Sequence, residues 1–298
     1  MKTALLVHNP GAGDEEHSKE KLTRLIRSHG FDCIYISVKD DDWKDFDHEF
    51  DILVIAGGDG TIRKVAKKLL KRKMIDKVWP IGLLPYGTAN NIAKTLHQDN
   101  DPENLIRSWQ GHNIQLYDVG RIENLSDADL FLESLGFGVF PYLMTEMSKR
   151  KESDDETPED KMIAALEQLH EIVFSYEPRH CELTIDGEDH SGQFLLLEVM
   201  NTKSIGPNLF LAPDADPGDG YLDIVAVTEE NKAKFGKYIA DKLEGIEEPF
   251  DFTRFRGKNI SISWPGTHLH ADDEVIKLKK SQEIKIELKE GLLQFLVE

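Results

Sequence analysis

The first 110 residues alternate between short apolar runs and segments in which apolar side chains recur at helical spacing. The apolar runs predict buried strands at residues 3–7, 31–38, 52–56 and 79–84. The periodic segments predict helices at about residues 15–29, 62–70, 92–96 and 101–110. Strands and helices that alternate at this spacing are typical of a doubly wound parallel sheet. We therefore expect an α/β domain over about residues 1–120.

The pattern changes after about residue 111. Strands are predicted at residues 113–122, 129–138, 181–185, 193–200, 222–227, 259–264, 268–271, 283–288 and 292–297, and helices at 159–176 and 232–243. Asp186 and Gly187 form a typical hairpin turn. The acidic stretch 40–51 and the charged run 149–160 are expected to be solvated loops. We expect a second, mainly antiparallel β domain over about residues 121–289.

Turn-forming residues follow three of the predicted parallel strands. They are Asn9, Pro10, Gly11, Ala12 and Gly13 after the first strand, Gly57, Gly58, Asp59, Gly60 and Thr61 after the third, and Gly87, Thr88, Ala89, Asn90 and Asn91 after the fourth. Ligands of such sheets gather at the carboxyl ends of the strands. We therefore expect the three loops to line one crevice.

The loop that starts at Gly57 is a natural seat for phosphate. Its glycines let backbone N–H groups approach an anion, and the N-terminus of the following helix adds a favourable dipole. Asp59 could hold a metal-bound water or a substrate hydroxyl, although it would repel a bare phosphate. The spacing differs from both the dinucleotide G-x-G-x-x-G pattern and the G-x-x-x-x-G-K-[ST] loop. The loop therefore indicates nucleotide chemistry, and the alternative is an ordinary tight turn with Asp near a helix N-cap.

The composition of the chain excludes several classes of function and location. The chain has 298 residues and a formal net charge of −19, which argues against non-specific nucleic-acid binding and against strong attraction to anionic membranes. The two cysteines, Cys33 and Cys181, are isolated, as reduced thiols in a cytoplasmic protein would be. No signal pattern follows Met1, and no apolar run is long enough to span a bilayer. We expect a cytoplasmic protein with no nucleic-acid partner.

A basic cluster stands out in this acidic chain. It consists of Arg63, Lys64, Lys67, Lys68, Lys71, Arg72 and Lys73. Such a cluster is either the solvent-facing side of a helix or a surface for anionic lipid headgroups.

Five motifs in order resemble the diacylglycerol kinase catalytic family, which includes bacterial lipid kinases and the sphingosine and ceramide kinases. Three of them are the strand-end loops described above. The fourth is the segment from Pro213 to Asp223, which resembles the family's P-x-A-x-x-x-D-G pattern, and the fifth is Asp272-Asp273-Glu274, where the family has Asp-Gly-Glu. Asp118 lies where the family has an acidic cleft residue that opens the second domain. The resemblance covers most of the chain.

This resemblance implies an N-terminal nucleotide-binding domain of the NAD kinase and diacylglycerol kinase type, followed by a β-sandwich. The last strand, about residues 290–298, could return to the first domain. ATP would contact the first two loops and, in addition, Ser37, Gly87, Thr88 and Asn90. Asp272 and Glu274 would activate the acceptor, and Asp59 would also take part in catalysis. Mg²⁺ would bind Asp219 with the carbonyls of Asp216 and Tyr221.

The implied activity is transfer of the γ-phosphate of ATP to a hydroxyl of diacylglycerol or a related lipid, with transient contact at a membrane surface and a place in phospholipid biosynthesis. One alternative is a kinase of a soluble acceptor such as NAD. The other is a catalytically impaired nucleotide-binding regulator, because Asn91 replaces the family's Asp and Asp273 replaces its central Gly. A φ > 0 requirement at position 273 would then cost energy. The oligomeric state is left open.

Structural alternatives exist for three of these groups. The aspartates between Pro213 and Asp223 could simply form turns. Asp272 to Glu274 could be a solvent-exposed hairpin turn. His268 and His270 share a strand face, and surface or packed histidines are a simpler reading than a metal site, which needs a third ligand.

Overall fold

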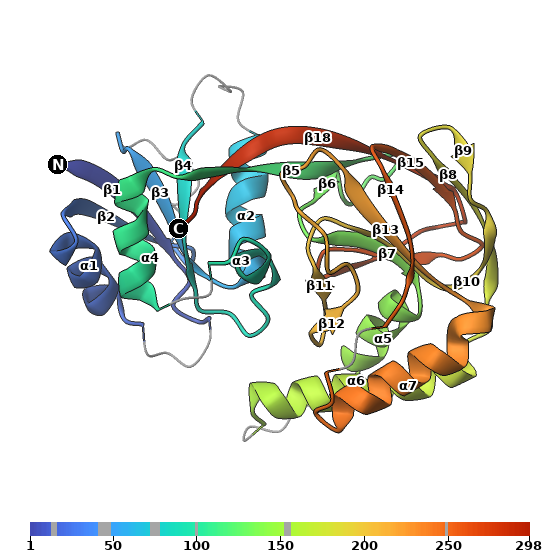
Figure 1. Cartoon of the computed structure of the whole chain (residues 1–298). Helices are drawn as coiled ribbons and strands as arrows, with labels where there is room; N and C mark the ends of the chain where they lie inside the picture. The colour runs from blue at the N-terminus through green and yellow to red at the C-terminus, as the bar shows by residue number, and fades with distance from the viewer. Residues whose placement is uncertain (13–16, 41–48, 72–77, 99–100, 152–155, 248–249) are drawn as a thin grey trace. The chain divides into compact units, whose positions relative to one another are not determined.

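The computed structural model describes residues 1–12, 17–40, 49–71, 78–98, 101–151, 156–247 and 250–298 (Figure 1). The chain divides into two compact units. The first comprises Met1–Asp118 with Glu290–Glu298, and the second comprises Val119–Lys289. Strands β5 (Ile114–Glu123) and β18 (Glu283–Leu296) each contribute residues to both units.

The first unit contains a parallel sheet. Its strand order is β2-β1-β3-β4-β18. The first four are β1 (Lys2–His8), β2 (Phe31–Ser37), β3 (Ile52–Gly57) and β4 (Pro80–Pro85). The C-terminal strand joins this sheet parallel to β4, with Phe295 opposite Ile81. All six residues of β3 are buried, as expected of a central strand covered on both faces.

Helices connect the strands of this unit, and the predicted α/β fold is confirmed. They are α1 (Lys19–Ser28), α2 (Asp59–Leu70), α3 (Asn91–Thr95), α4 (Pro102–Ser108) and a short 3-10 helix, η2 (Trp109–Gly111). Ser18 and Asp101 cap α1 and α4 by accepting backbone N–H groups of the first turn. Trp109 packs flat against β4 at Gly82, where a Cβ would lie only 2.6 Å from the indole. The predicted loop 40–51 lies mostly outside the described residues.

The second unit is a sandwich of two antiparallel sheets, as predicted. One sheet has the order β17-β16-β7-β10-β13-β14, and the other contains β8, β15 and the first half of β18, with β5, β6 and β9 at its margins. The strands are β6 (Leu130–Phe131), β7 (Ser134–Gly138), β8 (Arg179–Ile185), β9 (Glu188–Asp189), β10 (Gly192–Met200), β13 (Leu222–Thr228), β14 (Thr253–Gly257), β15 (Asn259–Ser263), β16 (His268–Ala271) and β17 (Glu274–Lys277). Side chains from both sheets share one apolar core that includes Phe137, Leu197 and Ile262.

A second core of this unit lies on the outer face of β10 and β13. Three helices cover it, namely α5 (Val139–Met147), α6 (Pro158–Ser175) and α7 (Lys232–Leu243), and α6 and α7 lie side by side (Figure 1). A short 3-10 helix, η3 (Glu229–Asn231), precedes α7, and a separate two-stranded sheet is formed by β11 (Ser204–Ile205) and β12 (Leu209–Phe210). Among the described residues, no helix is both long enough and apolar enough to cross a membrane.

Three features of this unit differ from the sequence-based prediction. Helix α5 follows β7 without a break in apolar character, so no boundary signal marks it. Strands β14 and β17 are short and partly exposed, and their periodicity is weak. The two strands predicted at 283–288 and 292–297 are one continuous strand, β18, in which Gly291 adopts φ +61°.

Candidate functional site

The second and third strand-end loops of the first unit touch through glycine backbones. A Cβ placed on Gly58 would lie 2.8 Å from the Cα of Gly87, and one placed on Gly87 would lie 2.4 Å from the Cα of Gly58. The side chain of Asn90, which has φ +52°, accepts the N–H of Gly87 at 2.9 Å. Only glycine fits at both contact positions. The structure therefore brings these two predicted loops together.

The first loop joins the second through a side-chain hydrogen bond. Asn9 Nδ2 donates to Thr61 Oγ1 at 3.2 Å, while Asn9 Oδ1 accepts the N–H of Gly11 at 3.2 Å. Gly13 lies outside the described residues. The three loops therefore meet at the carboxyl ends of β1, β3 and β4, where helix α2 begins.

Two histidines, His8 and His17, pack beside the first loop. His17 Nε2 donates to the carbonyl of Ala12, and the other nitrogen of that ring lies 3.0 Å from His8 Nε2. The His17 ring also stacks on Tyr86, which directly precedes the third loop, with ring centroids 4.2 Å apart. Burial, with the neighbouring charge of His17, lowers the pKa of His8 to about 4. His8 is therefore neutral at physiological pH, and the two rings together connect the first loop to Tyr86.

Asp59 connects the second loop to the start of α3. Its two carboxylate oxygens accept the backbone N–H groups of Asn91 and Ile92 at 2.9 and 3.0 Å. Burial raises the pKa of Asp59, whereas these two hydrogen bonds and the positive charges of Arg63 and Lys94 oppose the shift. The carboxylate that we predicted to be catalytic is thus engaged in holding two loops together.

Two cations near these loops were missed or misplaced by the sequence analysis. Arg63 was grouped with a surface cluster, but its side chain is buried, whereas Lys64 and Lys71 are exposed. Lys39 follows β2, and its Nζ would lie 3.7 Å from a Cβ on Gly11. Ser37 is buried and accepts the N–H of Lys39, and Thr88 is exposed. No local motif marks Lys39 or Arg63, because their positions depend on the packing of separate strands and helices.

Asp118 is buried in the first unit. Its Oδ1 accepts the N–H of Gly291 at 2.7 Å, which joins β5 to β18 where the latter bends. Asp118, predicted as a cleft residue, therefore also stabilises the contact between these two strands.

The acidic turn of the second unit is anchored. Asp272 and Asp273 connect β16 to β17, with Ala271 paired to Glu274. Asp272 Oδ1 accepts the N–H groups of Leu132 and Glu133 at 3.0 and 2.8 Å. Asp272 is buried and has φ +54°, whereas Asp273 and Glu274 are exposed. Position 273 therefore has no positive-φ requirement, and the positive φ falls on Asp272 instead.

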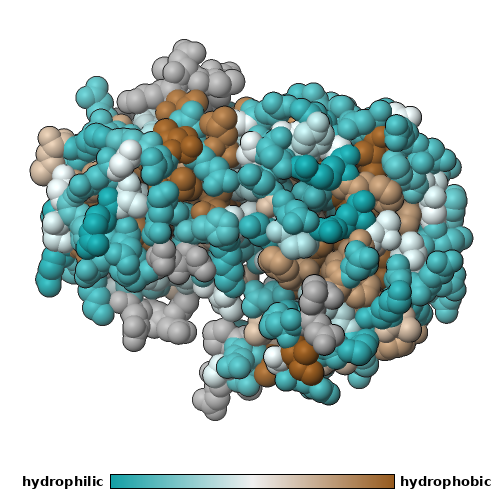
Figure 2. All heavy atoms as spheres, viewed as in Figure 1, coloured by the Kyte–Doolittle hydropathy of each residue, from teal (hydrophilic) through white to brown (hydrophobic). Residues whose placement is uncertain are grey.

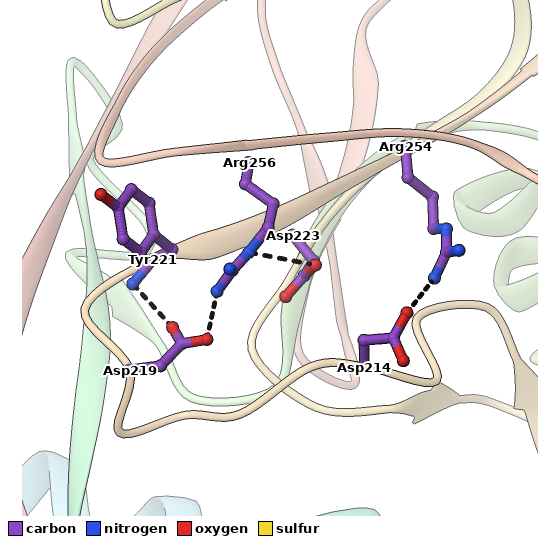
Figure 3. Close-up of polar contacts among 6 residues, drawn as sticks. All are labelled: Asp214, Asp219, Tyr221, Asp223, Arg254 and Arg256. Carbon is purple, nitrogen blue, oxygen red and sulfur yellow. Dashed lines mark hydrogen bonds and ion pairs between the residues drawn. The ribbon is translucent and has the colours of Figure 1, made fainter.

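Asp219, one of the residues predicted to bind magnesium, lies in an arginine–carboxylate cluster (Figure 3). The guanidinium of Arg256 pairs with the Asp219 carboxylate and also lies 3.7 Å from Asp223 Oδ1. The other oxygen of Asp219 accepts the N–H of Tyr221 at 3.0 Å. Burial raises the pKa of Asp223 to about 6, although the charge of Arg256 opposes that shift.

Arginine side chains engage two carboxylates of this segment. Arg256 already neutralises Asp219, and Arg254 pairs with Asp214 at 2.8 Å on the same segment (Figure 3). Asp216 Oδ1 accepts the N–H of Gly218 at 2.9 Å. Across the described parts of the chain, no three His, Cys, Asp or Glu side chains gather into a possible metal site. The magnesium site expected at Asp216, Asp219 and Tyr221, which uses one carboxylate and two backbone carbonyls, stays a prediction, and the structure adds that Arg256 pairs with that carboxylate.

Comparisons with known proteins agree with the predicted fold and family. Residues 3–122 match the family model for the diacylglycerol kinase catalytic domain, and residues 154–289 match that for the YegS C-terminal NAD kinase beta sandwich-like domain. A diacylglycerol kinase of Staphylococcus carnosus is 26% identical over 288 residues, covering 92% of this chain and 89% of the relative. A diacylglycerol kinase of Bacillus subtilis is 26% identical over 265 residues, covering 82% and 80%.

Two solved structures share the fold. A diacylglycerol kinase from Bacillus anthracis has a TM-score of 0.71 at 20% identity and covers 100% of this chain and 97% of that one. An NAD kinase from Archaeoglobus fulgidus in complex with ATP has a TM-score of 0.51 at 13% identity, covering 99% and 93%. The two family models together span both units, and the chain belongs to the diacylglycerol kinase catalytic-domain family, with a C-terminal domain of the YegS type.

Proposed function

We propose that this protein is an ATP-dependent lipid kinase that transfers the γ-phosphate of ATP to a hydroxyl of diacylglycerol or a related lipid. The observation that carries the proposal is the contact between Gly58 and Gly87 beside the N-terminus of α2. Side chains are excluded from that contact, so backbone N–H groups can approach a phosphate closely. Membership of the family, whose relatives are named diacylglycerol kinases, supports the same reading.

The first unit would bind the nucleotide. The N-terminus of α2 supplies N–H groups and a helix dipole, and Lys39, Arg63 and Lys94 add positive charge around the loops. These few cations matter because the whole chain carries a net charge of −19. Mg²⁺ bound to ATP would neutralise further phosphate charge, as it does in other phosphoryl transfers. Binding and orientation of the triphosphate are thus the work of backbone amides and placed cations.

Asp272 and Glu274 are the candidate carboxylates that would act on the acceptor. Phosphoryl transfer depends mainly on positioning and charge neutralisation, and a carboxylate can orient or deprotonate the attacking hydroxyl. Asp272 is buried and anchored by two backbone N–H groups, so its position is well defined. Glu274 is exposed at the first position of β17 and is the second candidate.

The surface of the protein suits brief contact with a lipid interface. The face shown in Figure 2 is mostly hydrophilic, with apolar patches. In the second unit, Tyr142, Phe174 and Phe210 are 45%, 52% and 48% exposed. Because the net charge is negative, we expect such apolar side chains, rather than electrostatic attraction, to make the contact.

A lipid kinase assay tests the proposal. Purified protein is incubated with labelled ATP, Mg²⁺ and mixed micelles that contain diacylglycerol, and the lipid product is measured. The matched control is Asp272→Asn, which keeps the Oδ1 acceptor for two backbone N–H groups and removes the charge. We expect labelled phosphatidic acid from the native protein and on the order of a hundredfold less from the variant. Equal product from both would contradict the proposed role of Asp272.

Two further arms distinguish the alternatives. Formation of NADP from NAD and ATP, with no lipid product, would instead identify a kinase of a soluble acceptor. ATP binding by calorimetry without turnover of any lipid or NAD would identify a nucleotide-binding regulator.

A further inference from the structure

Two fully buried titratable side chains meet next to the acidic turn. Glu198 of β10 and His270 of β16 both have 0% exposure. His270 Nε2 lies 3.1 and 2.9 Å from the two Glu198 oxygens, and His270 Nδ1 lies 2.8 Å from the carbonyl oxygen of Asp272. From the sequence, His270 was expected to be an ordinary packed or surface histidine, and no local pattern marks Glu198.

A glycine on the intervening strand makes this meeting possible. Strand β7 lies between β16 and β10, and Gly136 is opposite both His270 and Glu198 in register. A Cβ on Gly136 would lie 2.1 Å from the Glu198 carboxylate. Any other residue at this position would separate the two side chains. The contact between Glu198 and His270 therefore depends on the glycine backbone at position 136 as well as on the two side chains.

The hydrogen-bond partners determine where the protons are. The carbonyl of Asp272 can only accept, so Nδ1 of His270 carries a proton and donates it. A second proton lies between His270 Nε2 and the Glu198 carboxylate, and it is bonded either to the imidazole or to the carboxyl group. If that proton were lost, a neutral His270 would place its remaining hydrogen on Nε2, facing the carboxylate, and the donor to Asp272 would disappear.

The surroundings favour retention of that proton. Burial raises the pKa of Glu198. Burial alone would lower the pKa of His270, but the charge and hydrogen bond of Glu198 raise it overall, and Asp272 adds to that rise. The other elements packed against the imidazole present Gly136 from β7 and the ring of Phe140, 5.0 Å away on α5.

We infer that Glu198 and His270 form a positioning pair that holds the backbone of Asp272 in place for the proposed reaction. Asp272 has φ +54°, a conformation that is costly for a residue with a side chain. Hydrogen bonds from Asp272 N–H to the Ser134 carbonyl, at 2.7 Å, and from His270 to the Asp272 carbonyl hold both sides of this residue. The inference rests on the proposed function for the catalytic role of Asp272, but not for the contact itself.

Two substitutions at position 270 separate positioning from packing. Asn at this position places its amide nitrogen near the place of Nδ1 and can still donate to Asp272. Gln places its amide nitrogen near the place of Nε2 and cannot. Both are made in a Glu198→Gln background, because a lone carboxylate in this buried site would destabilise the fold. The two double variants then differ mainly in the donor that reaches Asp272.

We expect the Glu198→Gln parent and Glu198→Gln/His270→Asn to keep kcat within about fivefold of the native protein. Glu198→Gln/His270→Gln should lose on the order of tenfold to a hundredfold in kcat, because the turn that carries Asp272 shifts. The KM for ATP should stay the same in all three. If the Asn and Gln variants lose kcat equally, or if neither loses it, the positioning role is wrong.

A second readout does not depend on activity. The amide of Asp272 should exchange with solvent at a native rate in the Asn variant and at least tenfold faster in the Gln variant. This measurement decides the inference even if the native protein phosphorylates no lipid, an outcome that would refute only the proposed function. Native exchange in both variants would show that the His270 donor does not hold the turn.

Discussion

Replacing Gly58 with alanine tests the contact on which the nucleotide site depends. The added methyl group would lie 2.8 Å from the Cα and 3.5 Å from the N of Gly87. Ordinary carbon contacts are about 3.5–4 Å, so the two backbones must separate by roughly 1 Å. Gly58 has φ −91°, which alanine adopts without strain, so the cost is steric.

The expected magnitude follows from two opposing effects. Overpacking of a tight contact costs about 1–3 kcal/mol. Replacing glycine at an allowed φ returns about 0.4–1 kcal/mol, because the unfolded chain loses conformational freedom. The net expectation for Gly58→Ala is therefore a destabilisation of about 1–2 kcal/mol. ATP binding should weaken as well, because the loops can no longer approach each other.

The matched control is Gly11→Ala in the first loop. Its added methyl group would meet nothing closer than 3.7 Å, so no steric cost is expected. Unfolding in guanidinium chloride gives the free energies, and calorimetry gives the ATP affinities. If Gly58→Ala unfolds at the same denaturant concentration as Gly11→Ala, the two glycine backbones are not in contact and the reasoning fails.

Three further predictions concern other parts of the molecule. Without nucleotide, Mg²⁺ and EDTA should each leave the melting temperature of the native protein unchanged, because Arg256 occupies Asp219; a rise with Mg²⁺ that Asp219→Asn abolishes would show a metal site. The pKa of His8, about 4, lies below its usual 6.5, so the folded state resists protonation and stability is lost as the pH falls from 6.5 towards 4. The loss should reach about 1.4 kcal/mol per pH unit relative to a His8→Gln variant, and parallel pH profiles of the two would refute it. Asp59→Asn should cost about 1–3 kcal/mol, because its amide would face the backbone N–H of Asn91 or Ile92; unchanged denaturation would contradict the observed bonds.

Local sequence patterns were sufficient for the main elements and for the loops. Residues 52–56 predict a buried strand because the apolar run lies within one short segment. Strand β3 occupies Ile52–Gly57. The glycines at positions 57, 58 and 87 indicate that the backbone is approached closely there, because only glycine lacks a Cβ. The predicted helix at residues 232–243 matches α7 at both ends.

Local sequence patterns could not predict contacts between residues that are far apart in the chain. His270 and Glu198 are 72 positions apart, and Asp272 and Glu133 are 139 apart. Nothing near either member of a pair marks its partner, because the register of separate strands decides which side chains meet. Likewise, Arg256 lies on β14, a strand that the pattern did not reveal, so its pairing with Asp219 could not be foreseen.

The amino-acid sequence by itself therefore determined the α/β and sandwich halves of this protein, its family and the three strand-end loops, because each depends on residues that are neighbours in the chain. Tertiary structure alone decided that Asp59 binds the start of α3, that Arg256 pairs with Asp219, and that the buried His270 contacts the carbonyl of Asp272. These outcomes depend on which strands and loops pack together, and that packing is a property of the whole fold.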